Sequence, residues 1–335
     1  MAPSGGNSQS WKFIVCGDAI RIIALPEKDH EVLNVACRGT YIAHGAVMEN
    51  IAIAARHFGH EASFTILPEK NVSADVTFRS LEEIRTHEID LYDAIFTRHT
   101  NRKPYKTEPL LEDTKQFIFD ETGRFTHCAV STIEGAGIRP VAESSANDIC
   151  IYLGNQLLHQ LLFKEIIWNE DEQHMRGGLF VKTMEAKPPK SIVFKLMRHW
   201  SVAKFLKKIG LHKKIYEENA GTMASASLLG AITVPGSDSD FIEAGRLLQN
   251  IWLRTAERGL SLHLMTGIVY LWQRISSDGK DIFSNEEVVL IQNAYTKLKD
   301  AYTIGDRMIA VTFRIGDAPP PLAVSLKRPP EIDWK

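Results

Sequence analysis

The sequence predicts an α+β protein built from two related parts, and three observations lead to this prediction. First, two short apolar runs, Trp11–Cys16 and Ala19–Leu25, flank Gly17-Asp18, a pattern typical of two strands joined by a tight turn. Second, helical spacing follows from about residue 31 to residue 58. Third, a similar succession of helix, glycine and strand recurs about 200 residues later.

Each helix of this recurring pattern stops at a glycine, the residue favoured where a chain leaves a helix. The first ends at Gly59, with a strand expected at Ala62–Leu67, and the second runs from about 239 to 258 and stops at Gly259. Aligning segments 45–64 and 244–263 with a shift of one residue pairs identical residues: Asn50 with Asn250, Ile51 with Ile251, Gly59 with Gly259. Chance similarity of two amphipathic helices and internal duplication both explain this alignment.

The middle of the chain carries an unusual basic segment. A long helical region is expected at about 137–165, and residues 182–214 then hold ten Lys/Arg and one acidic residue, Glu185, among apolar side chains. Three interpretations stay open: a basic amphipathic helix that touches a membrane surface, a lid over an anionic ligand, or the solvated face of an inserted helix. A strand at Met308–Ile315 and a Pro-rich, extended tail are expected at the end.

The bulk composition excludes several classes of protein. A net charge of −2 argues against a general nucleic-acid binder, and no apolar run reaches the roughly 18 residues of a membrane span. No export signal is recognisable, and a cytoplasmic location is expected. The cysteines are widely spaced and are expected to be reduced thiols: Cys16, Cys37, Cys128 and Cys150. GxSxG, HExxH and Cys/His metal spacings do not occur, so neither hydrolase chemistry nor a metal site is expected.

A small-residue loop, Pro3–Trp11, leads into the first expected strand. Gly5 and Gly6 allow the backbone to approach a flat ligand closely. Polar side chains that can bond the edge of a heteroaromatic ring are Ser4, Asn7 and Gln9. The loop lacks the GK[ST] of a phosphate-binding P-loop, and a disordered terminal stretch is the alternative interpretation.

Two basic motifs suit a phosphate group. Arg98 and Arg102 flank Thr100, so two guanidinium groups and a hydroxyl can bind phosphate oxygens, although a solvated basic turn is an equal alternative. His99 is expected to act as a spacer. Lys327-Arg328 near the end would add charge to the same phosphate if the tail packs against the core.

These motifs together resemble those of the nitroreductase family of FMN enzymes. PSGGNSQSW is similar to the family's PSxxNxQPW segment, and RHTNRKPY to the RRSxR segment that holds the FMN phosphate. SLKRPPE resembles the closing KSRxPxE segment. GLSLHLMTG (259–267) resembles the GLxxxPxEG stretch, whose backbone near the glycine meets the flavin ring. The combined resemblance covers nearly the whole chain.

The order of the motifs is reversed relative to the family, because PSGGN precedes RHTNR by about 90 residues. This order resembles the Acg-like branch, in which two nitroreductase-like halves are fused into a pseudo-dimer with one FMN site. The resemblance implies central mixed and antiparallel sheets flanked by helices. The expected division of the chain is therefore a truncated first half at 1–93 and a second half at 94–335, and the basic segment is expected to form a lid-like insertion at 180–215.

The resemblance implies FMN as the cofactor and no catalytic side chain, because the flavin carries the chemistry. Arg98, Thr100, Arg102 and Arg328 would anchor the phosphate, and the N–H of Thr266 or Gly267 would meet the flavin N5. The implied cofactor-binding residues are Pro3, Ser4, Gly5, Asn7, Gln9, Arg98, His99, Thr100, Arg102, Met265, Thr266, Gly267, Lys327 and Arg328. The family pattern is altered at Ser10, His99 and Thr266, which stand in place of proline, arginine and glutamate.

The implied function is an FMN-dependent oxidoreductase that passes electrons from NAD(P)H to a quinone, nitro or similar acceptor in a ping-pong cycle. A flavin-sequestering or storage protein with little turnover is the alternative, motivated by the lid-like insertion. A peripheral membrane enzyme that uses residues 182–214 is a third possibility of lower weight. A monomer or a homodimer is expected, and no nucleic-acid partner.

Overall fold

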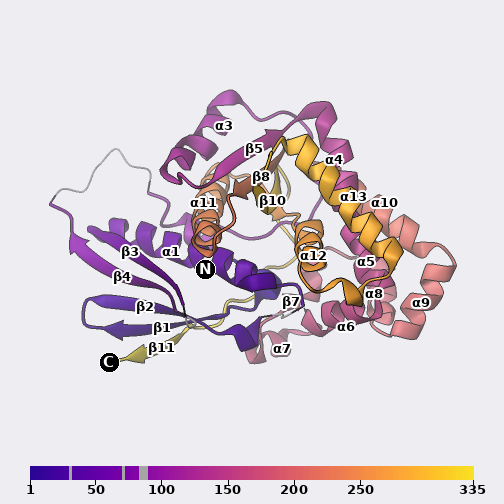
Figure 1. Ribbon diagram of the computed structural model, residues 1–335, viewed down its shortest axis with the longest axis horizontal. Helices are drawn as coiled ribbons and strands as arrows, with labels where there is room; N and C mark the ends of the chain where they lie inside the picture. Colours follow the sequence, from indigo (N-terminus) through magenta and orange to yellow (C-terminus); the bar gives the residue numbers. More distant parts are fainter. Residues whose placement is uncertain (30–31, 70–71, 83–89) are drawn as a thin grey trace.

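The computed structural model describes residues 1–29, 32–69, 72–82 and 90–335. The chain has the predicted α+β architecture, with antiparallel and mixed sheets flanked by helices. Figure 1 shows a strand-rich part on one side, a pair of long helices in the middle, and a cluster of helices on the other side.

The strand-rich part is a five-stranded sheet in the order β11-β1-β2-β4-β3. Strands β1 (Trp11–Cys16) and β2 (Ala19–Ala24) form the predicted antiparallel pair, with Gly17 in the turn at a φ of 55°. The hairpin β3 (His60–Glu69) and β4 (Val72–Ser80) extends the sheet. Strand β11 (Glu331–Trp334) pairs in parallel with β1, so the tail returns to the part of the fold where the chain begins.

The second sheet has four strands. Its order is β5-β8-β10-β9, and every neighbouring pair is antiparallel. The strands are β5 (Ala129–Ile133), β8 (Leu228–Val234), β10 (Met308–Gly316) and β9 (Ser261–Leu264). All of β8 and nearly all of β10 are buried, so this sheet lies in the core. A two-stranded parallel pair, β6 (Ile166–Ile167) and β7 (Leu179–Phe180), stands apart.

The two helices predicted to recur are α1 (Arg38–His57) and α11 (Asp238–Glu257). The glycine ends are confirmed, because Gly59 and Gly259 have φ values of 77° and 69°. The predicted start at about residue 31 was wrong, since α1 begins only at Arg38. A 3₁₀ turn with left-handed residues precedes it and interrupts the helical path. Residue 31 itself lies outside the described residues.

Helices α1 and α11 cross at their glycines. A Cβ on Gly45 would lie 2.0 Å from the carbonyl oxygen of Ile242, and a Cβ on Gly245 would lie 2.0 Å from that of Ile42. Each contact therefore repeats the other with the helices exchanged, as around a two-fold axis. The backbones approach so closely that no larger residue fits at either glycine.

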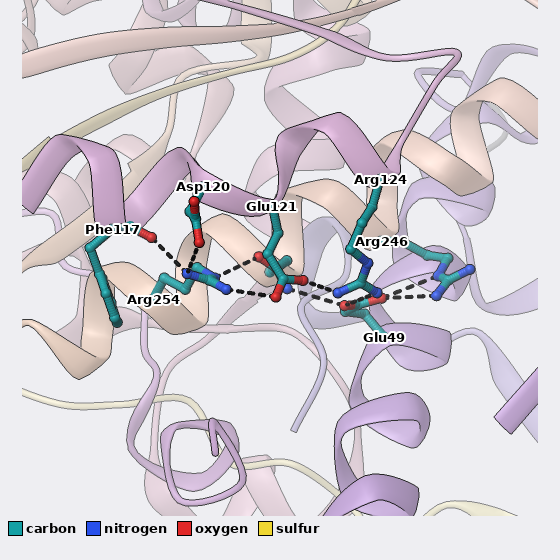
Figure 2. A network of polar contacts seen from close by, with 8 residues as sticks. Glu49, Phe117, Asp120, Glu121, Arg124, Arg246 and Arg254 are labelled. Atoms are coloured by element: carbon teal, nitrogen blue, oxygen red, sulfur yellow. Dashed lines mark hydrogen bonds and ion pairs between the residues drawn. The ribbon is translucent and has the colours of Figure 1, made fainter. Parts of the chain in front are cut away.

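Polar pairs repeat this exchange in the next turn of the helices. Gln249 donates to Asn50 across 2.7 Å, and Asn250 donates to Glu49 across 3.2 Å. Figure 2 shows that the polar contacts extend from Glu49 through Arg124 and Glu121 to Arg254. Arg246 binds the buried Glu49 carboxylate at 3.1 Å, and Arg254 bonds Asn250 and pairs with Glu121 at 2.9 Å. These symmetric contacts are consistent with internal duplication, which stays a prediction.

The remaining helices form the cluster on the other side of the pair. They are α4 (Ile138–Ser145), α5 (Asn147–Gly154), α6 (Gln156–Glu165), α7 (Glu170–Met175), α8 (Lys190–Met197), α9 (Trp200–Lys208), α10 (Leu211–Ala224), α12 (Gly267–Ser276) and α13 (Asn285–Tyr302). Two short helices, α2 (Ala94–Thr97) and α3 (Glu112–Phe119), lie before them in the chain. The helical region predicted at 137–165 is confirmed, and it is divided into three helices.

Candidate functional site

One cavity of about 630 Å³ collects side chains from segments that lie far apart in the sequence. The N-terminal loop, the segment after α2, the junction of β9 with α12, and the C-terminal tail all contribute to its wall. The sequence-predicted residues on this wall are Pro3, Ser4, Gly5, Asn7, Arg98, His99, Thr100, Arg102, Thr266, Gly267 and Lys327. The fold therefore assembles most of the predicted set around a single space of ligand size.

The N-terminal loop is held in place by bonds to distant segments. Gly5–Asn7 form a 3₁₀ turn in which Gly6 and Asn7 have φ values of 55° and 57°. The Asn7 amide donates to the carbonyl oxygens of Gly178 and Leu326, at 3.3 and 3.0 Å. No heavy atom lies within 4 Å of where a Cβ on Gly5 would be, so the backbone is open to an approaching ligand there.

Arg98 is a buried cation on this wall. Its side chain lies over the ring of Trp252, with 4.3 Å from Cζ to the ring centroid, and its Nη2 donates to the carbonyl oxygen of Met1. Within the described residues its Nε has no hydrogen-bond partner and no carboxylate pairs with the guanidinium group. Burial lowers the pKa of Arg98 to about 10. A buried guanidinium without a counter-ion favours an anion beside it.

Two further cations face the same cavity. Arg102 donates to the carbonyl and hydroxyl oxygens of Thr183, each at 3.4 Å, and burial lowers its pKa. Lys327 donates to Asn7 Oδ1 at 2.6 Å. Burial, with a smaller effect from the charge of Arg98, lowers the pKa of Lys327 to about 7. All three side chains line the cavity, so its wall can attract an anion such as a phosphate.

The segment between the first two arginines is fixed to the core sheet. Thr100 forms a parallel bridge with Leu262 of β9, and the ring of His99 bonds the carbonyl oxygen of Thr97 at 2.8 Å. The bridge keeps Thr100 beside the arginines. The role of His99 as a spacer stays a prediction.

The start of α12 supplies backbone N–H groups. Thr266 is the N-cap and Gly267 the first residue of the helix, and the first N–H groups of a helix have no partner within it. A Cβ on Gly267 would lie 2.0 Å from Asp148 Oδ2, so only glycine fits there. This helix end can therefore donate to a ligand, and it favours a negative one.

Three predicted residues do not line the cavity. Gln9 is turned inward, where its Oε1 accepts from the backbone of Arg328 at 2.9 Å. Met265 is 2% exposed in the core and bonds Thr312 of β10 through its backbone N–H. The Arg328 side chain lines a separate, smaller hollow beside Trp11 and Glu331. The spacing within a motif does not reveal where these three side chains point, because each orientation depends on contacts with residues far away in the chain.

Other residues of the cavity wall escaped the sequence analysis. They include Asp29, Asn34, Asp148, Tyr152, Glu165, Trp252, His263 and Tyr270. Asp148 carried a detectable signal, since it is the one acidic residue in the stretch NDICIYLG and directly precedes an apolar run. Asp29 and Asn34 lie in the irregular segment before α1, and the remainder lie on helices and strands whose patterns indicate only amphipathic surfaces.

The predicted lid-like segment touches the cavity only at its beginning. Thr183 lines the wall, whereas α8 and α9 pack beside α5 and α6 through Met197, Phe163 and Phe194. Exposed apolar side chains remain on these two helices and at the end of α9: Ile192, Leu196, Phe205 and Ile209. Contact of residues 182–214 with a membrane surface stays a prediction, to be checked by co-sedimentation with anionic liposomes at low salt.

No helix among the described residues combines the length and the apolar character that crossing a bilayer requires.

No protein-family model matches the chain. An uncharacterized protein of Mycobacterium tuberculosis (strain CDC 1551 / Oshkosh), MT1398, is 24% identical over 335 residues. The match covers 98% of this chain, and the chain spans 46% of that protein, about half its length.

Several solved structures of flavoproteins are similar to the chain at low overlap. A nitroreductase with bound FMN from Desulfitobacterium hafniense is 10% identical, with a TM-score of 0.39 and coverage of 72% of this chain and 96% of that one. The FMN-dependent nitroreductase NfnB from Mycobacterium smegmatis, in complex with NADPH, is 12% identical, with a TM-score of 0.35 and coverages of 68% and 87%. A BluB-like flavoprotein from Clostridium difficile 630 is 11% identical, with a TM-score of 0.36 and coverages of 72% and 96%. At this level of similarity, none of them carries a function over to this chain.

Proposed function

We propose that the cavity binds FMN and that the chain is an FMN-dependent oxidoreductase of the nitroreductase type. The observation that supports this most is the buried Arg98, which has no carboxylate partner among the described residues and faces the same space as Arg102 and Lys327. Burying such a charge costs free energy that a bound anion recovers. A phosphate monoester is an anion that suits guanidinium forks.

The rest of the cavity wall fits a flat ring attached to that phosphate. The loop around Gly5 leaves room beside its backbone, and the start of α12 offers N–H groups at Thr266 and Gly267. Tyr152 and Tyr270 add aromatic surface. The wall thus combines cationic side chains, an accessible glycine backbone and backbone N–H groups, which are the groups that can bind the phosphate and the ring of a flavin mononucleotide.

A bound flavin would accept a hydride from a nicotinamide and pass electrons to a second substrate, so no side chain need act as a nucleophile. The chain's own residues bind, orient and shield. Arg98, Thr100 and Arg102 hold the phosphate, while Ser4 and Asn7 meet the polar edge of the ring or its chain. We propose NAD(P)H as the donor and a quinone, nitro or similar compound as the acceptor.

A flavin-sequestering role is the second candidate, and one contact favours it. Arg102 bonds Thr183, so the beginning of the predicted lid is tied to the phosphate end of the cavity. A ligand held beneath this contact would leave slowly and would meet nicotinamide poorly. Turnover, rather than binding, separates the two functions.

The separating experiment is anaerobic addition of NADH or NADPH to the flavin-loaded protein. Rapid bleaching of the flavin bands, recorded after mixing in a stopped-flow instrument and followed by reoxidation with a quinone, supports the oxidoreductase. Bands that persist while photochemical reduction still bleaches them support storage. The rate of FMN release to an excess of apoflavodoxin gives an independent reading, because storage predicts slow release.

A further inference from the structure

Asp148 lies at the beginning of α5 on the wall of the same cavity. Among the described residues its buried Oδ1 has no hydrogen-bond partner, and its Oδ2 packs against Gly267 at the start of α12. Within the described residues no lysine, arginine or histidine pairs with this carboxyl. The side chain is partly buried, with its Oδ1 atom covered by protein, and it lines the cavity.

The polar and ionisable groups around this part of α5 offer the carboxyl little stabilisation as an anion. They are Cys150 and Tyr152 on α5, Glu165 on α6, Lys207 on α9, Tyr216 on α10, Tyr270 on α12 and Glu287 on α13. Lys207, the one cation in this set, lies beside Gly154 at the far end of α5. The positive end of the α12 dipole is the favourable contact, and it acts together with the backbone N–H of Ile149.

Enclosure in this environment favours the protonated form of the carboxyl. Burial raises the pKa of Asp148 to about 7. The group therefore exchanges its proton near neutral pH, where the two forms are closest in free energy. A carboxyl of this kind in a cavity wall is suited to hand a proton to a bound molecule.

We propose that Asp148 is the proton donor of this site, which deepens the function proposed above and rests on it. Reduction of a quinone takes up two electrons and two protons. A reduced flavin held in the cavity would supply both electrons and one of the protons as a hydride. The O–H bond of Asp148 breaks to supply the second proton, and the resulting carboxylate regains a proton from water.

A proton donor and a side chain that only packs against Gly267 predict different results for Asp148→Asn. The amide has nearly the shape of the acid and packs equally well, but it cannot release a proton. Glu165→Gln, which alters another carboxyl of the cavity wall, is the matched control, and Asp148→Ser is a second variant in case the asparagine variant fails to fold.

The first readout needs no flavin. Infrared difference spectra of the unloaded protein between pH 6 and pH 9 are expected to show the C=O band of one protonated carboxyl in the wild type and in E165Q. The band is expected to be missing in D148N and D148S. A band of equal size in D148N would overturn the assignment of the proton to Asp148.

The second readout counts protons taken up when the loaded protein is photoreduced at pH 8 in the presence of an indicator dye. The wild type and E165Q are expected to take up one proton more per flavin than D148N, because negative charge on the reduced ring favours protonation of Asp148. Equal uptake in all three would overturn the donor role. If FMN does not bind at all, the proposed function fails, yet the infrared band still tests the carboxyl separately.

Discussion

At the scale of the residue, the cavity is defined by charges that the protein itself leaves unbalanced. Arg98 is 7% exposed, contacts an indole face and a carbonyl oxygen, and has no ion-pair partner among the described residues. Such an arrangement lowers the stability of the unliganded protein. We infer that the buried charge of Arg98 is retained because a bound anion balances it.

Replacing Arg98 by alanine is expected to weaken FMN binding by roughly 2–3 kcal/mol, a factor of about 30–150 in Kd, because a charge-assisted bond to the phosphate is lost. Titration followed by flavin fluorescence measures the effect. Arg21→Ala is the control, since Arg21 pairs with Asp75 in the first sheet, away from the cavity. An R98A variant that binds as tightly as R21A would contradict the phosphate assignment.

Lys327 links stability to pH. Its pKa of about 7 in the folded protein lies below the ordinary 10.5, so the unfolded chain binds the proton more tightly. The stability of the unliganded protein therefore rises between pH 7 and pH 10.5 and is lowest below pH 7, where the buried charge must be carried.

Lys327→Met is expected to raise the free energy of unfolding at pH 6 by roughly 1–3 kcal/mol, an advantage that fades toward pH 10. The same change is expected to weaken FMN binding, since a cation near the ligand is lost. Urea unfolding at the two pH values measures the first effect. A variant less stable than the wild type at pH 6 would show that the Lys327–Asn7 bond outweighs the cost of the buried charge.

At the scale of the element, the crossing of α1 and α11 organises the molecule. Gly245→Ala would place a methyl group 2.0 Å from a carbonyl oxygen of the other helix. The helices must separate, and a loss of roughly 3 kcal/mol in stability is expected. Gly221→Ala in α10 is the control, because no neighbour lies within 4 Å, and it is expected to stabilise by about 0.5–1 kcal/mol. Equal stability of the two variants would contradict the close crossing.

Several elements could be predicted from the sequence because their signals are local. The β1–β2 turn, the glycines after α1 and α11, and strand β10 all lie where the pattern places them. The start of α1 could not be predicted, because the break before it comes from the left-handed backbone of Ala36 and Cys37, which are not residues that signal such a backbone. The pairing of β11 with β1 joins residues over 300 positions apart, which no local pattern encodes.

At the scale of the whole molecule, those residues of the cavity wall that belong to a recognisable sequence motif could be predicted. The arginines around Thr100 and the small-residue loop are such cases. Gln9 and Arg328 also belong to motifs of the resemblance, yet the backbone of Arg328 donates to Gln9 and neither side chain lines the cavity. Asp148 and Tyr270 reach the cavity only through packing of α5 against α12, so their place depends on tertiary structure.

The fold also predicts how the chain behaves as a unit. Contacts between Gly45 and Ile242 and between Gly245 and Ile42 have the exchanged form of a two-fold interface within one chain. If two fused halves pair in this way, the site needs no second copy to be complete. Sedimentation equilibrium and FMN titration at dilutions that dissociate any oligomer are expected to show unchanged FMN affinity. An affinity that falls on dissociation would indicate a site shared between chains.

The central claim is that the cavity is a site for a flavin bearing a phosphate. Isothermal titration of the protein with FMN, and in parallel with riboflavin, tests it most directly. The account predicts one FMN per chain, with the yellow bands of bound flavin, and binding of riboflavin weaker by at least about tenfold because the phosphate contacts are missing. Absence of FMN binding, or equal binding of both compounds, would contradict it.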